Sequence, residues 1–394
     1  MIISRSLKNL LLLSVAMLVA IPIGFNIGQL SGKPLVIFFS DFLALISLFF
    51  LFKLRNPYVF KLFFLLIIIF IVFLISNMFA IASNVVGSQT AALSFVREFR
   101  AFPIVFLGAY IQNRYHYSFE KQFSFVLFVV PFLLIASDIM LKQNWPYGRW
   151  GGHFLGFDIL GFPNTVGILY VMLFALCLSK AIMFGGKWIV PSLLWLFIIT
   201  LLGSRIVLAA SFFVFISMLL FKIQKSLKLL ALLVIILMVA AATLDISQLF
   251  NIYISKFTRI FTEGVLGARA EIFHELLSAI YQRPLLGHGY APVAGYLSEF
   301  SSAHNQYLNI IFRVGLVGMI VFALFWGYIF SVFWKLKGSY KALLFGFLGC
   351  LIGGFTQATF GYNGVSTFLF FFFGVAAESL QSSKNNRGSI IENS

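Results

Sequence analysis

The stretch FFLLIIIF at residues 63–70 carries no polar side chain on any face. It lies inside a longer apolar run, residues 58–81, which as a helix is long enough to cross a hydrocarbon layer of about 30 Å. A transmembrane β-strand would instead alternate polar and apolar residues over about ten positions. This stretch therefore predicts a membrane-spanning α-helix and excludes a β-barrel.

The composition of the whole chain agrees with this prediction. Of the 394 residues, 61% are hydrophobic and only 10% are charged, and the mean hydropathy is +1.01. A soluble domain of this composition would have too little polar surface to cover its core. Cys177 and Cys350 lie inside apolar runs, where we expect packing residues rather than a disulfide or a metal site. The sequence predicts an all-α integral membrane protein.

The chain contains about twelve apolar runs that are separated by polar or turn-forming clusters. The runs are residues 7–25, 34–52, 58–81, 91–112, 119–141, 162–184, 187–203, 204–222, 226–244, 306–333, 340–360 and 362–380. We therefore predict nine transmembrane helices in residues 1–244 and three in residues 306–381. A larger periplasmic loop at 245–305 would separate helices 9 and 10, and residues 382–394 would form a cytoplasmic tail.

The positions of the basic residues predict the orientation of the helices. With the N-terminus in the cytoplasm, most of the 28 lysines and arginines fall in cytoplasmic segments, and the short outer loops hold only Lys33, Lys142 and Arg149. The positive-inside rule then places both termini in the cytoplasm. Because topology accounts for most of the +16 net charge, we expect a lipid bilayer as partner and no nucleic acid.

Four arginines do not fit this topology signal: Arg97, Arg100, Arg205 and Arg313 lie within or at the outer ends of predicted helices. A charge at the centre of a transmembrane helix costs roughly 2.5–3.5 kcal/mol. The arginines can snorkel to headgroups or pair internally, for example with Glu98. Alternatively, they line a basic pocket for an anionic group such as phosphate, to which arginine donates two hydrogen bonds at once. Because all four lie toward one side and no matching carboxylates occur in the spans, we favour the pocket.

The outer loop contains a predicted amphipathic helix. Apolar residues at positions 272, 273, 276, 277 and 280 have helical spacing, Arg269 lies at the start, and Pro284 ends the helix. Residues 286–290 are typical of a flexible turn. His304 then lies at the junction between the loop and helix 10, where a histidine is more often a headgroup contact or a cap than a catalyst.

The other histidines give no metal site. His153, His274 and His288 have no clear partner in the sequence, and no HExxH or paired-cysteine spacing occurs. We therefore expect neither a metal nor a cofactor.

Three motifs in this part of the chain, taken in order, resemble the O-antigen ligase and polymerase superfamily. They are GSR at 203–205 at the outer end of a helix, LGAR at 266–269 opening a loop helix, and GHG at 287–289 followed by His304, Asn305 and a Gly-rich helix. The resemblance covers about residues 203–318. It implies a GT-C-type glycosyltransferase that uses neither a nucleotide sugar nor a metal. The donor would be a glycan on undecaprenyl pyrophosphate, and the acceptor a sugar hydroxyl of lipid A-core, at the periplasmic face of the bacterial inner membrane.

The resemblance also implies roles for individual residues. By motif position, Arg205 and Arg269 correspond to the arginines that hold the pyrophosphate, and His304 to the histidine proposed to activate the acceptor. This agrees with their chemistry, because arginines can stabilise a pyrophosphate leaving group and a neutral imidazole can accept a hydroxyl proton. A single in-line displacement would invert the anomeric centre. The candidate substrate-binding residues are Arg97, Arg100, Arg313 and Asn305.

The ligase hypothesis has three alternatives. A polymerase of the same superfamily would use another lipid-linked repeat unit as acceptor, with nearly the same donor site; the modest outer loop and a chain near 400 residues favour the ligase. A protein-glycosylating relative is a further alternative. A flippase or transporter commonly has internal repeats and ionisable groups near the bilayer midplane. Here the ionisable residues cluster toward one face and no repeat is found, which favours an enzyme.

Overall fold

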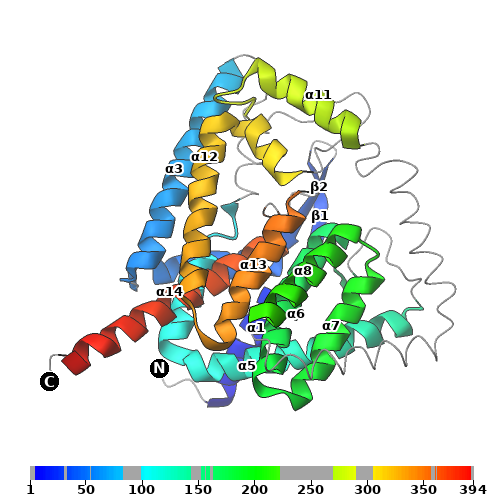
Figure 1. Ribbon diagram of the computed structural model, residues 1–394, viewed down its shortest axis with the longest axis vertical. Helices are drawn as coiled ribbons and strands as arrows, with labels where there is room; N and C mark the ends of the chain where they lie inside the picture. The colour runs from blue at the N-terminus through cyan, green and yellow to red at the C-terminus, as the bar shows by residue number, and fades with distance from the viewer. Residues whose placement is uncertain are drawn as a thin grey trace.

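The computed structural model describes residues 5–30, 33–53, 55–82, 99–142, 152–155, 157–159, 163–221, 269–289, 305–355, 360 and 362–391. Most of these residues are helical, and the helices pack into one bundle (Figure 1). The coarse prediction of an all-α, multi-pass membrane protein is confirmed. The exact count of twelve spans remains a prediction, since the predicted ninth span at 226–244 lies outside the described residues.

Five described helices are long and apolar enough to cross a membrane. They are α3 (Pro57–Ala82), α5 (Ile104–Met140), α6 (Pro163–Phe184), α12 (Gln306–Lys335) and the first part of α14 (Asn363–Ile391). The shorter helices are α1 (Arg5–Ala20), α2 (Phe39–Ser47), η1 (Leu48–Lys53), η2 (Gly186–Trp188), α7 (Ile189–Leu201), α8 (Arg205–Phe221), α11 (Arg269–Gln282), η4 (Gly338–Lys341) and α13 (Ala342–Gly353). The strands are β1 (Gly24–Leu30), β2 (Lys33–Phe38), β3 (His153–Phe154) and β4 (Phe157–Asp158).

The predicted helix at 34–52 was wrong at its start, because residues 33–38 form a strand. β2 pairs antiparallel with β1 in a register that joins Gly24 to Phe38. The β-branched residues of β2 favour an extended backbone. The helix begins only after Phe38, whose backbone N–H donates to a carboxylate oxygen of Asp41 at 2.9 Å, a contact typical of a helix N-terminus. The sequence pattern did not separate this apolar strand from the apolar helix that follows it.

The predicted spans at 91–112 and 119–141 correspond to the two parts of α5, which starts at Ile104. The backbone leaves helical geometry at Tyr115, with φ −136° and ψ 19°, so two helices meet at a kink there. The break predicted between positions 112 and 119 therefore agrees with this kink, whereas the start of the first span was predicted too early, because residues 100–103 form turns before α5.

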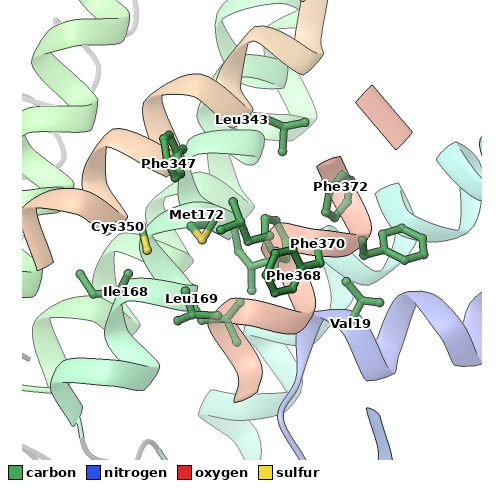
Figure 2. Close-up of a cluster of buried hydrophobic side chains, with 14 of the residues drawn as sticks. Val19, Ile168, Leu169, Met172, Leu343, Phe347, Cys350, Phe368, Phe370 and Phe372 are labelled. Carbon is green, nitrogen blue, oxygen red and sulfur yellow. The ribbon is translucent and has the colours of Figure 1, made fainter. Parts of the chain in front are cut away.

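The core of the bundle is rich in phenylalanine, and α14 supplies much of it. Figure 2 shows side chains from α1, α6, α13 and α14 meeting, including Phe368, Phe370 and Phe372. α14 packs closely along α5, where a Cβ on Gly108 would lie 2.0 Å from the carbonyl oxygen of Phe371. Small residues allow such close approach between membrane helices. Cys350, like Cys177, is fully buried, and the two cysteines form no disulfide with each other.

A buried carboxylate joins three helices at one end of the bundle. Glu378 on α14 accepts hydrogen bonds from Asn56 at 2.8 Å and from Asn113 on α5 at 2.7 Å. Asn56 also caps α3 through its side-chain oxygen, which accepts from the backbone N–H groups of Tyr58 and Val59. In Figure 1 the end of α14 points to the lower left, whereas α11 lies at the top. α11, the described helix of the predicted outer loop, and the end of α14 therefore lie at opposite ends of this view.

Candidate active site

α11 is the amphipathic helix expected in the outer loop, and Arg269 is its first described residue. Its apolar face is buried, with Leu276 at 0% and Ile272 at 2% exposure, whereas Glu271 and His274 are exposed. In Figure 1, α11 extends from the upper ends of α3 and α12 across the top of the bundle, and it packs against α12. The structure thus places Arg269 at the start of a helix whose other end leads into a loop on α12.

α12 is broken near its start, at Gly315, which has φ 65° and ψ −168°. In an unbroken helix the carbonyl groups of Phe312 and Arg313 would accept hydrogen bonds from residues four positions later. Here they accept from a different part of the chain: His288 N–H donates to Phe312 at 2.7 Å, and Gly289 N–H donates to Arg313 at 2.8 Å. The loop that follows α11 therefore supplies the hydrogen bonds that these two carbonyl groups lose at the break.

The N–H groups on the other side of the break are satisfied by the same loop. Leu316 donates to the carbonyl of Pro284 at 2.8 Å, and Val317 donates to that of Leu285 at 3.3 Å. The Ser76 hydroxyl of α3 lies 2.6 Å from the carbonyl oxygens of both Leu286 and Arg313. We call residues 283–289 the clamp loop, because they replace the missing helical hydrogen bonds on both sides of the break.

The clamp loop requires glycine at both sides of the contact. Gly287 has φ 68°, and a Cβ there would lie 2.5 Å from the carbonyl carbon of Arg313. A Cβ on Gly315 would lie 2.1 Å from the carbonyl oxygen of Leu285. These contacts give a structural reason for the glycines of the GHG motif and for the first glycine of the Gly-rich helix.

His288 is the buried centre of the clamp loop, although no partner for it was apparent in the sequence. It is 2% exposed, and its ring stacks on Phe312 with centroids 4.9 Å apart. Its Nε2 lies 2.7 Å from the carbonyl oxygen of Ala279 on α11. A carbonyl oxygen can only accept, so Nε2 carries the proton. One side chain therefore connects α11 to α12.

Acidification should destabilise this region. Burial lowers the pKa of His288; the hydrogen bond to Ala279 opposes this effect, and the charge of Arg283 adds to it. A histidine whose pKa is lower when folded binds fewer protons in the folded state, so its contribution is complete above the unfolded pKa of about 6.5 and decreases as the pH falls below it. We expect the melting temperature in detergent to fall between roughly pH 7 and pH 5, and to fall less in His288→Gln. Equal falls in both proteins would contradict this role of His288.

Three polar side chains lie along one side of α12 before the break, at four-residue spacing. Asn305 caps the helix: its Oδ1 accepts from the N–H groups of Tyr307 at 2.9 Å and Leu308 at 3.0 Å, while its Nδ2 donates to Phe355 at 3.1 Å. Asn309 follows one turn later and Arg313 one turn after that. We call Asn305, Asn309 and Arg313 the polar face of α12.

Asn309 is the residue of this face that sequence reasoning missed. It is 9% exposed, and its Oδ1 is buried without a hydrogen-bond partner in the described part of the chain. A buried acceptor without a partner costs about 1–3 kcal/mol, so buried polar groups of this kind call for an explanation. A lone asparagine in an apolar run gives no signal of this burial before the fold is known.

Arg205 lies at the first position of α8, where the sequence placed it. The turn before it contains Gly203 with φ 62°, and the Ser204 hydroxyl accepts from the N–H of Val207 at 3.5 Å. The side chain of Arg205 is exposed and forms no ion pair or hydrogen bond with another residue that the structure describes. An exposed guanidinium at a helix N-terminus is a favourable environment for an anion.

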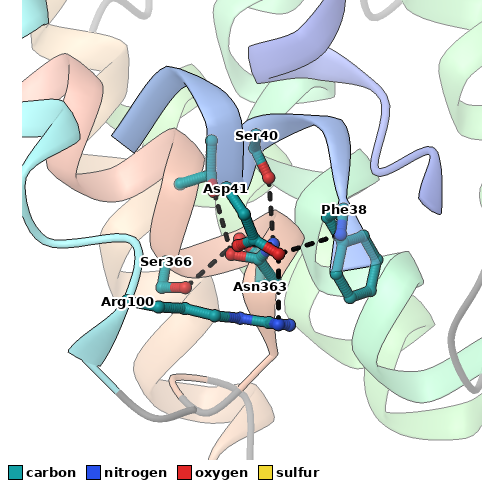
Figure 3. A network of polar contacts seen from close by, with 7 residues as sticks. Phe38, Ser40, Asp41, Arg100, Asn363 and Ser366 are labelled. Carbon is teal, nitrogen blue, oxygen red and sulfur yellow. Dashed lines mark hydrogen bonds and ion pairs between the residues drawn. The ribbon is translucent and has the colours of Figure 1, made fainter. Parts of the chain in front are cut away.

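Arg100 has a carboxylate partner, contrary to the expectation that the spans hold none. Its Nη1 lies 3.2 Å from Oδ2 of Asp41, and its guanidinium lies over the ring of Phe38 (Figure 3). Asn363 donates to the other oxygen of Asp41 at 3.2 Å and to Ser40 at 2.9 Å. Asp41 of α2 therefore contacts both Arg100 and the start of α14, and its carboxylate balances the charge of Arg100.

Of the remaining candidate residues, His153 and His274 are described with their side chains. His153 pairs with buried Asp138 of α5 through its ring Nδ1 at 3.1 Å and its backbone N–H at 3.0 Å, so this histidine does have a partner. His274 is exposed on α11. Arg97 and His304 lie outside the described residues, and Arg269 is described only by its backbone.

The polar face, the clamp loop, α11 and the Arg205 turn all lie within one segment that resembles a known family. Residues 189–323 match the O-antigen ligase family over the stretch from the first residue of α7 to beyond the break in α12. The resemblance predicted from the three sequence motifs is thereby confirmed. No curated protein matches the chain.

The O-antigen ligase segment separates the candidate residues into two groups. Arg205, Arg269, His304, Asn305 and Arg313 lie inside it, as do Asn309 and His288, which the sequence alone did not single out. Arg97 and Arg100 lie outside it. Together with the apolar helices, the family assignment supports a multi-pass membrane enzyme of the ligase or polymerase type that acts on lipid-linked glycans.

Proposed function

We propose that the chain is an O-antigen ligase. It transfers a glycan from undecaprenyl pyrophosphate to a sugar hydroxyl of lipid A-core at the periplasmic face of the bacterial inner membrane. The observation that carries the proposal is that the O-antigen ligase segment includes both the exposed Arg205 at the start of α8 and the Arg269 start of α11.

The reaction is a single displacement at the anomeric carbon. The acceptor hydroxyl oxygen forms a bond to this carbon, while the bond to the pyrophosphate oxygen breaks and its electron pair leaves with the polyprenyl pyrophosphate. His304 takes the hydroxyl proton. Arg205 and Arg269 stabilise the negative charge that grows on the leaving group, a role that a metal fills in other phosphate chemistry. The product has the opposite anomeric configuration.

The polar face of α12 supports this assignment. His304 is followed in the chain by Asn305. The side chain of Asn305 caps α12 and donates a hydrogen bond to the carbonyl oxygen of Phe355, two residues after the end of α13. Asn309 and Arg313 lie one and two turns further along the same side. We assign them to glycan and pyrophosphate binding, with the Asn309 oxygen accepting a hydrogen bond from a sugar hydroxyl.

Replacing Asn309 with leucine should separate stability from activity. Removing a buried acceptor without a partner should leave the melting temperature unchanged or raised, because an apolar side chain of similar size carries no desolvation penalty. Transfer should nevertheless fall about tenfold or more through a higher KM for a glycan substrate, since one hydrogen bond is lost.

Asn113→Leu is the matched control, because Asn113 donates to buried Glu378 at the opposite end of the bundle. This variant should lower the melting temperature and leave KM unchanged. A normal KM in Asn309→Leu would refute the assignment of Asn309 to glycan binding.

The proposed function is tested with purified protein in nanodiscs, a lipid-linked glycan donor, and either lipid A-core or a second lipid-linked repeat as acceptor. We expect glycan on lipid A-core, and we expect the rate to be the same in excess EDTA. Elongation of the second lipid-linked repeat would instead identify a polymerase with the same donor chemistry. Loss of activity in EDTA, restored by a divalent ion, would contradict the metal-free mechanism.

A further inference from the structure

The connection between α11 and α12 has a geometric consequence for Arg269. Arg269 precedes Ala279, the contact of His288, by ten residues, which is about 15 Å along a helix axis. A tilt of about 10° around Ala279 would therefore move the backbone of Arg269 by roughly 2–3 Å. A misplacement of about 1 Å at a catalytic group can reduce a rate about 100-fold.

The apolar face of α11 does not by itself fix such a tilt. Ile272 and Leu276 are buried against the bundle, but apolar contacts are non-directional and tolerate small rotations. The contact between His288 and Ala279 is directional, because it requires a short N–H···O hydrogen bond. The ring that donates it is held from the other side by stacking on Phe312 of α12.

The backbone of His288 is held as firmly as its side chain. Its N–H donates to the carbonyl of Phe312, and the next residue, Gly289, is so close to α3 that a Cβ would lie 2.7 Å from that of Ala80. The imidazole thus has a fixed position relative to α12 and α3, and it transmits that position to α11 through a single hydrogen bond.

We propose that His288 is a positioning residue: it fixes α11 on the break in α12 and thereby sets where the backbone of Arg269 lies relative to Asn305, the α12 cap that follows His304 in the sequence. The role in catalysis rests on the proposed function, but the fixing of α11 does not. His288→Gln keeps an N–H donor at the place of Nε2. His288→Phe keeps the aromatic ring against Phe312 but cannot donate to Ala279.

The test measures the position of α11 directly. Cysteines introduced at Glu271 on α11 and at Ile320 on α12 are both exposed in the folded protein, whereas native Cys177 and Cys350 are fully buried. Spin labels at the two introduced sites give a distance distribution in nanodiscs. We expect a narrow distribution for the unsubstituted protein and for His288→Gln, and a broad or shifted one for His288→Phe. His274→Phe, on the exposed side of α11, is the matched control and should keep the narrow distribution.

Glycan transfer by the same variants gives the second measurement. The kcat of His288→Phe should fall about 10- to 100-fold and be restored in His288→Gln. If His288→Phe lowers only the melting temperature and leaves both the distances and kcat of the folded protein unchanged, His288 has a stability role and the proposal is overturned. If the unsubstituted protein transfers no glycan while the distances respond as expected, the proposed function and the catalytic role fail, but the fixing of α11 stands.

Discussion

Glycan transfer should fall by at least about 100-fold when Arg205, Arg269 or His304 is replaced by alanine, while the protein remains folded and inserted. The two arginines would stabilise charge that develops on the pyrophosphate leaving group, an interaction that is stronger in the transition state than in the ground state. The histidine would remove the acceptor proton, a step that typically contributes 10²- to 10⁴-fold. Initial rates with a lipid-linked glycan, normalised to the monodisperse protein in size-exclusion chromatography, measure these effects.

Two further variants test whether the geometry and the position of the arginines matter, and not only their charge. Arg269→Lys keeps the positive charge but loses the planar pair of donors, so it should recover only part of the rate. Arg114→Ala removes an exposed arginine of α5 that is predicted to face the cytoplasm, and it should transfer glycan normally. Near-normal transfer by all three alanine variants would refute the catalytic assignment.

Gly315→Ala should cause the largest loss of stability. The added Cβ would meet the carbonyl group of Leu285 at 2.1 Å, and the positive φ disfavours any residue with a side chain. Backbone strain of this kind costs about 1–3 kcal/mol and overpacking costs a similar amount, so we expect a loss of several kcal/mol or no folded protein. The melting temperature and the monodisperse yield in detergent measure this loss.

The same helix offers a matched control for this substitution. A Cβ added at Gly327, beyond the break in α12, has nothing within 4 Å. Gly327→Ala should therefore be neutral or slightly stabilising, since alanine favours a helix over glycine. Equal stability of Gly315→Ala and Gly327→Ala would contradict the close contact between Gly315 and the clamp loop.

The long apolar helices could be predicted from the sequence, because a helix satisfies all backbone hydrogen bonds of a long apolar run within that run. α3, α6 and α8 start and end within a few residues of the prediction. α11 was predicted from helical periodicity, and the structure confirms a helix over the described residues Arg269–Gln282. These features depend only on neighbouring residues.

Features that depend on distant residues were not predicted. The apolar run at 34–52 begins as a strand because residues 24–30 pair with it, and α12 breaks at Gly315 because the clamp loop supplies the missing hydrogen bonds. Arg100 pairs with Asp41, which lies 59 positions earlier in the chain. Periodicity and composition contain no information about such pairings.

The candidate site shows the same division. The motifs indicated Arg205, Arg269 and His304, whereas Asn309 and His288 became apparent only through burial and through contacts made in three dimensions. In the sequence, one is a lone asparagine in an apolar run and the other a lone histidine between two glycines. Their environment, rather than their residue type, makes them candidates.

The most direct test of the proposed chemistry is the stoichiometry of one reaction mixture. Purified protein in nanodiscs, an undecaprenyl-pyrophosphate-linked glycan and lipid A-core are incubated in EDTA, and mass spectrometry quantifies the released polyprenyl pyrophosphate and the glycosylated lipid A-core. We predict that the two products appear in equal amounts, with the anomeric configuration of the transferred sugar inverted. Release of polyprenyl pyrophosphate without any glycosylated acceptor, or transfer that requires a divalent metal, would contradict this account.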